Sequence, residues 1–156
     1  MVLALHMITG AVLAGGGGNA GEAIVLGLTS HYFLDSIPHI EYKIENIVRG
    51  NFKAAKEFAK IFLDLLIGLA IVFYLLQNKN FGQMAIILTG AFFAILPDGL
   101  VFLDFGIQDK NKNIFTKFLG KHGQAHKKIH STATNKILTV SAQIIVIGVL
   151  AFAIIK

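Results

Sequence analysis

The long apolar runs of this sequence limit its fold more than any other feature. Three of them are Ile61–Leu76, Phe81–Phe105 and Ile137–Ile155, and the last holds no charged residue. A helix needs about 20 apolar residues to cross the hydrocarbon core of a bilayer. Charged residues make up only 15% of the chain, whereas a typical soluble domain has about 25%. Because so few charges cannot cover three apolar helices in water, the runs predict three membrane-spanning helices.

The N-terminal part of the chain predicts a different element, a tight helical hairpin. Two shorter apolar segments, Val2–Ala14 and Ala20–Ile37, flank four glycines and an asparagine. Each glycine in a helix costs about 1 kcal/mol relative to alanine, so this stretch favours a turn. No basic residue precedes the first apolar segment, in contrast to a secretory signal peptide. We therefore expect the first helix to be retained.

Together these segments predict an all-α integral membrane protein that forms a single helical domain over residues 1–156. It consists of an N-terminal helical hairpin, three further transmembrane helices and an amphipathic helix on the cytoplasmic side. The expected helices span approximately residues 2–14, 20–37, 57–77, 82–105, 112–131 and 134–155. The chain has no cysteine, which excludes a disulfide scaffold and thiolate metal ligands. The sequence leaves the oligomeric state open.

The basic residues indicate how the helices are oriented. Residues 41–60 and 109–136 contain 12 of the 14 basic residues. Two predicted crossings separate these segments, so both lie on the same side of the membrane. The positive-inside rule places that side in the cytoplasm. We therefore expect a protein of the cell membrane, or inner membrane, whose site faces the cytoplasm. The same lysines can contact anionic lipid headgroups. No nucleic-acid-binding module is recognisable, and topology explains the charge, so we expect membrane lipids and not nucleic acid as partners.

Ionisable residues in membrane segments are costly to bury, and they mark candidate functional sites. The predicted topology brings such residues, including all six histidines, to one level near the cytoplasmic boundary. They are His6, His31, Asp35, His39, Asp64, Asp98, His122, His126 and His130. Polar residues scattered by chance would not converge in this way. We therefore expect a metal-binding or proton-transfer site at this level.

The spacing of these residues indicates metal chemistry. His31 and Asp35 are four residues apart and share one helix face. The histidines of the second basic segment, at positions 122, 126 and 130, repeat this spacing. Imidazole and carboxylate ligands suit zinc above all, with manganese, iron or nickel as alternatives. Two alternatives need no metal: a buried hydrogen-bonded pair at His31 and Asp35, and a solvated face of an amphipathic helix at the three later histidines.

The order of these motifs resembles that of the small predicted membrane-bound metal-dependent hydrolases of bacteria and archaea. The resemblance covers residues 1–131 and rests on an early helix histidine, the sequence SHYFLDSIPH, a later LPD, and a closing HxxxH followed by serine. The HxxxD spacing of His31 and Asp35 is also distantly similar to a ligand motif of zinc-dependent phospholipase C. The resemblance implies six metal-site positions: His6, His31, Asp35, Asp98, His126 and His130. Many family members carry a histidine soon after their LPD motif, and this chain does not.

Two functions remain open from the sequence. The first is a metal-dependent hydrolase acting on a phosphoester or another ester, with a phospholipid headgroup as a candidate substrate. In it, Asp64 or Glu41 would act as general base, and His39 or His122 would protonate the leaving group. The second is a non-catalytic membrane protein that binds or conducts metal ions or protons. A conduit needs polar residues at every depth, and the outer halves of the spanning helices nearly lack them, which favours the hydrolase.

Overall fold

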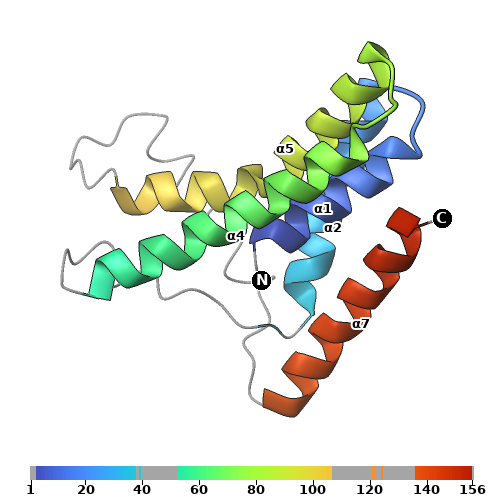
Figure 1. Cartoon of the computed structure of the whole chain (residues 1–156). Coiled ribbons are helices and arrows are strands. Elements are labelled where there is room, and N and C mark those ends of the chain that lie inside the picture. Colours follow the sequence, from blue (N-terminus) through green and yellow to red (C-terminus); the bar gives the residue numbers. More distant parts are fainter. Residues whose placement is uncertain are drawn as a thin grey trace.

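The structure, a computed structural model, describes residues 3–37, 39, 53–106, 121, 124 and 136–155. Within these ranges the chain forms helices and no strand, which confirms the predicted all-α class (Figure 1). The helices are α1 (Leu3–Gly15), α2 (Ala20–Ser36), α4 (Lys53–Leu75), α5 (Phe81–Gly106) and α7 (Lys136–Ile155). Most of the helix predicted over residues 112–131 lies outside the described residues.

The predicted hairpin of α1 and α2 is present, and its turn is closed by side-chain caps. Asn19 precedes α2 and accepts a hydrogen bond from the backbone N–H of Glu22 at 3.0 Å. The Glu22 carboxylate in turn accepts from the N–H of Gly18 at 2.7 Å. The first bond satisfies an N–H group at the start of α2 that has no partner within the helix, and the second ties the turn to that helix start. At the other end α2 stops at Ser36, and Ile37 is extended, as expected for a residue that precedes a proline.

Glycines let α1 and α2 pack directly against the backbone of α5. A Cβ atom added to Gly10 of α1 would overlap the carbonyl of Gly90 and the side chain of Ala94 on α5. A Cβ on Gly27 of α2 would lie 2.7 Å from the same Gly90 oxygen. The three helices therefore meet where they carry almost no side chain, as in close-packed helix pairs within membranes.

Two helices are long and apolar enough to cross a bilayer, and both belong to the predicted set. They are Ala54–Leu75 within α4 and Phe81–Leu103 within α5, of 22 and 23 residues. At 1.5 Å per residue each exceeds the hydrocarbon thickness of about 30 Å. The apolar stretch Val140–Ile154 of α7 is shorter. Three spanning helices were expected after the hairpin, and the described residues supply two.

One boundary differs from the prediction in an informative way. Helix α4 begins at Lys53, before the predicted residue 57, because the added residues, Lys-Ala-Ala-Lys, are themselves good helix formers. Helix α5 continues through Pro97, in agreement with the single helix predicted over residues 82–105. Proline removes one hydrogen bond and typically bends a helix at that point. Figure 1 shows α5 changing direction along its length.

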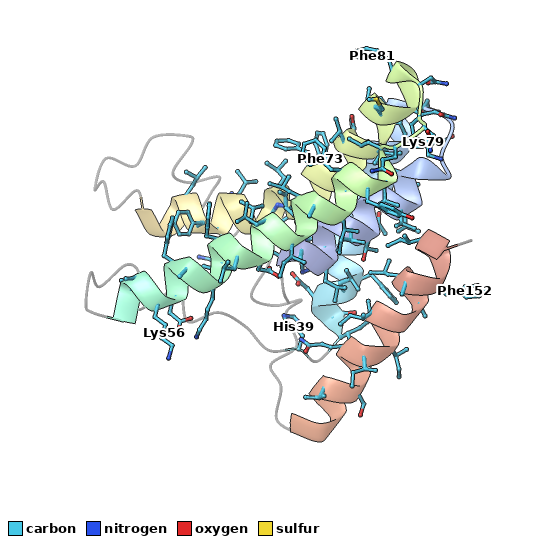
Figure 2. The ribbon with its side chains drawn as sticks, viewed as in Figure 1. His39, Lys56, Phe73, Lys79, Phe81 and Phe152 are labelled. Atoms are coloured by element: carbon cyan, nitrogen blue, oxygen red, sulfur yellow. The ribbon has the colours of Figure 1, made fainter. Side chains whose placement is uncertain are left out.

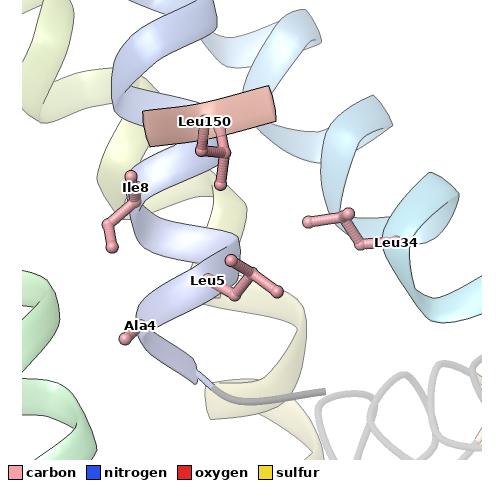
Figure 3. Close-up of a cluster of buried hydrophobic side chains, with 5 residues drawn as sticks. All are labelled: Ala4, Leu5, Ile8, Leu34 and Leu150. Carbon is pink, nitrogen blue, oxygen red and sulfur yellow. The ribbon is translucent and has the colours of Figure 1, made fainter. Parts of the chain in front are cut away.

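Large apolar side chains lie mainly on the outside of the described structure. Phe73, Phe81 and Phe152 are exposed, and Figure 2 shows them pointing away from the helices. Among the residues whose side chains the structure describes, no phenylalanine is buried, and six of the thirteen buried apolar residues are alanines. One buried cluster joins α1, α2 and α7 through Ala4, Leu5, Ile8, Leu34 and Leu150 (Figure 3). The interior therefore combines close helix contacts at glycine and alanine with clusters of aliphatic side chains, and the exterior is apolar and carries phenylalanines.

Adding a methyl group at the contact between α1 and α5 should disrupt the fold. We expect Gly90→Ala to lower the free energy of unfolding by about 1–3 kcal/mol, since its Cβ would overlap Ala14 and Gly10. Thermal unfolding in detergent, followed by circular dichroism, measures this. Gly148→Ala in α7 is the matched control, because a Cβ there meets nothing within 4 Å. Equal melting temperatures for Gly90→Ala and the wild type would contradict the packing described above.

Candidate metal centre

The start of α1, the end of α2 and the middle of α5 meet at a buried polar centre. Because α1 and α2 are antiparallel, His6 near the beginning of α1 lies beside His31 and Asp35 near the end of α2. Asp98 joins them from α5, one residue after Pro97. His6 and His31 are fully buried at 0% exposure, and Asp35 is 1% exposed. The Asp98 side chain is 32% exposed, so the centre reaches the surface on that side.

The Asp35 carboxylate lies between the two histidines and offers one oxygen to each. Its Oδ1 is 3.2 Å from Nε2 of His6, and its Oδ2 is 3.1 Å from Nε2 of His31. Nε2 of His31 is also 4.0 Å from Oδ1 of Asp98. The two imidazole rings lie with their centroids 4.5 Å apart. The four side chains therefore form one compact group.

A hydrogen bond to a backbone carbonyl determines which ring nitrogen of His31 faces this group. Nδ1 of His31 lies 2.8 Å from the carbonyl oxygen of Ala94. A carbonyl oxygen can only accept a hydrogen bond, so Nδ1 carries the hydrogen and donates the hydrogen bond. In the neutral ring Nε2 then presents its lone pair to the carboxylates. Such a hydrogen bond on the far ring nitrogen is the usual way in which proteins orient a metal-binding histidine.

The turn of α5 that offers this carbonyl is the one before Pro97. Proline has no N–H, so the carbonyl of Phe93, four residues before Pro97, has no helical donor. Ala94 lies in that turn and points its oxygen at His31. Sequence reasoning identified Asp98 of the LPD motif as a site residue and did not predict the contact of His31 with Ala94. A proline one residue before an aspartate in a membrane helix is the signal that could have found it.

The donor set of this centre fits a divalent cation. His6, His31 and Asp98 offer ligand atoms that all lie within 4.8 Å of one another, close enough to hold one metal ion. Nδ1 of His6 is buried and has no hydrogen-bond partner in the part of the chain that the structure describes. A lone pair on Nε2 of His31, 3.1 Å from a carboxylate oxygen, is repulsive unless a proton or a cation lies between them. Two imidazoles and carboxylates without thiolate suit zinc or another first-row metal.

The other predicted site residues fall into two groups. Asp64 is buried, and its Oδ2 accepts a hydrogen bond from the backbone N–H of Ala4 at 3.0 Å. His39 is buried after the end of α2, with Nδ1 2.7 Å from the carbonyl oxygen of Ile37. The remaining predicted site residues lie outside the described residues: Glu41, His122, His126 and His130. The catalytic roles assigned to Asp64 and His39 stay predictions.

Comparison with known proteins adds no further constraint. No family model, curated protein or solved structure matches the chain. The metal centre therefore rests on the geometry of its own side chains.

Removing a ligand should abolish stoichiometric metal binding. We expect His31→Ala and Asp98→Ala to lose the zinc that the purified wild type retains, because each deletes one of the clustered donors. Elemental analysis of the purified protein measures this. Glu22→Gln is the matched control, since Glu22 is an exposed carboxylate at the opposite end of α2. Equal zinc content in His31→Ala, Asp98→Ala and the wild type would refute the metal centre.

Proposed function

We propose that the protein resides in the cell membrane, or the inner membrane where a cell has two, with its metal centre near the cytoplasmic boundary. The two helices long and apolar enough to cross a bilayer support this, as do the exposed phenylalanines of α4, α5 and α7. Contiguous apolar surface of this kind is unfavourable in water. Lys56 lies near the end of α4 that precedes its apolar part (Figure 2), on the side that the positive-inside rule assigns to the cytoplasm.

We further propose that the protein is a metal-dependent hydrolase of a phosphoester or another ester. The observation that carries the proposal is the convergence of His6, His31, Asp35 and Asp98 in one buried group with a single partly exposed member. A bound metal would polarise the ester and lower the pKa of a water molecule that attacks it. Partial exposure of Asp98 gives a substrate one direction of approach to the otherwise buried donors.

The chain's own residues would orient and surround the reaction. The Ala94 carbonyl holds His31 in one tautomer, and the Asp35 carboxylate lies between the two imidazoles. The small-residue packing of α1, α2 and α5 excludes bulk water from the inner side of the group. An ester in a lipid headgroup would reach this depth from the membrane surface, and lysines such as Lys56 would attract an anionic one.

One observation favours the second candidate, a non-catalytic metal-binding or proton-binding protein. Both described histidines of the centre are fully buried, as in structural metal sites, whereas a catalytic site keeps an open coordination position. In that case the metal would tie α1, α2 and α5 together. The partial exposure of Asp98 is why we place the hydrolase first.

Membrane residence predicts resistance to extraction. We expect the protein to stay in the membrane pellet after alkaline carbonate treatment and to enter solution only with detergent, because α4 and α5 expose apolar faces along their length. Immunoblotting of the two fractions measures this, with a peripheral protein of the same membrane as control. Release by carbonate alone would overturn the membrane proposal.

Hydrolysis should depend on metal and on the centre. We expect the zinc-loaded protein in detergent to cleave a nitrophenyl phosphate, a nitrophenyl ester or the headgroup of phosphatidylglycerol vesicles, and His31→Ala to reduce that rate to background. Chelation should stop the reaction and added zinc should restore it. Release of nitrophenol or of the headgroup is measured, with Glu22→Gln as control. A wild type that is fully zinc-loaded and inactive on all three would favour the non-catalytic candidate.

A further inference from the structure

The carboxylate of Asp64 meets the beginning of α1 and not the metal centre. Its Oδ2 accepts from the N–H of Ala4 at 3.0 Å within the first turn of α1, and Asp64 is buried. This N–H is one of the first four of a helix, which have no partner inside the helix. A carboxylate at a helix start is also favoured by the helix dipole. Asp64 therefore caps α1 from another helix.

A second contact, independent of this hydrogen bond, places α1 against the same face of α4. One turn after Asp64, a Cβ on Gly68 would lie 3.0 Å from the Cα of Ala4 and 3.1 Å from Cε of Met7. Another turn later Val72 packs in one buried cluster with Met7. Asp64, Gly68 and Val72 thus form one stripe of α4 on which the first turns of α1 rest.

The metal ligand His6 lies on a different side of the same turn of α1. It follows Ala4 by two residues, a rotation of about 200° and a rise of about 3 Å along the helix. The side of α1 with Ala4 faces α4, whereas His6 faces Asp35 of α2. Any shift of the α1 start relative to α4 would move His6 by a similar amount. Metal ligands tolerate displacements of only a few tenths of an ångström.

We propose that Asp64 is a positioning residue of the metal centre, which sets the place of His6 by anchoring the N-terminus of α1, and is not its general base. This inference rests on the proposed metal-dependent function and assigns Asp64 a role within it. What the role needs is a hydrogen-bond acceptor at this position. A general base instead needs an ionisable group.

Two substitutions separate the roles. Asp64→Asn keeps an acceptor oxygen and removes the ionisable group, whereas Asp64→Ala removes both. For a positioning residue we expect Asp64→Ala to weaken zinc affinity about 10- to 100-fold, as loss of supporting partners does in other metal sites, and Asp64→Asn to change it less than about threefold on the same scale. Competition with a chromophoric chelator measures the affinity. Asn19→Ala, which removes the cap of α2 at its far end from the centre, should leave zinc affinity unchanged.

A second measurement works without metal. His6 and His31 are both fully buried, so diethylpyrocarbonate should modify neither in the wild type. In Asp64→Ala we expect His6 to become reactive while His31 stays protected, as peptide mass spectrometry would show. Reactivity of both would mean general unfolding, and Asp64→Ser, which keeps a shorter acceptor, then replaces the alanine variant.

The outcomes distinguish this inference from the proposed function. Wild-type zinc affinity together with a protected His6 in Asp64→Ala would overturn the positioning role and leave the metal centre standing. Normal zinc affinity in Asp64→Asn with loss of hydrolysis would restore Asp64 as the general base. A wild type that binds no zinc would overturn the proposed function, and the reactivity of His6 would still decide whether Asp64 anchors α1.

Discussion

The close approach of the α1 and α5 backbones at Gly10 and Gly90 is the contact on which the described structure depends. Neither residue has a side chain to separate the helices, and Gly27 brings α2 against the same stretch of α5. Packing of this kind gains its stability from van der Waals contact between backbones and not from burial of large apolar side chains. The large side chains remain free to cover the outside, where the proposed membrane would solvate them.

The same close approach makes the candidate metal centre possible. Short side chains such as aspartate and histidine can meet across three helices only if the helix axes lie close together. Each donor is then oriented by a partner away from the centre: the Ala94 carbonyl turns His31, and in our proposal Asp64 places His6 through the start of α1.

Local features of this architecture could be predicted because their causes are local. The glycine run predicted the hairpin. The four-residue spacing predicted that His31 and Asp35 share a helix face, and in the structure Nε2 of His31 lies 3.1 Å from the Asp35 carboxylate on α2. The start of α4 was placed four residues too late, because the Lys-Ala-Ala-Lys segment before it has no apolar periodicity but consists of good helix formers. The contact of Asp64 with Ala4 could not be predicted, since it joins two helices far apart in the chain.

The sequence by itself determined the helical class and the hairpin, since these follow from composition and turn residues; the common membrane level of the polar residues stays a prediction. It could not decide which polar residues touch. That was decided by tertiary structure, because the rotation and register of one helix against another depend on which small residues interlock. Gly10 of α1 and Gly27 of α2 both meet Gly90 of α5; in the resulting arrangement His6 lies beside Asp35, and the opposite side of α1 lies against Asp64. One turn of α1 thereby serves both the centre and its anchor.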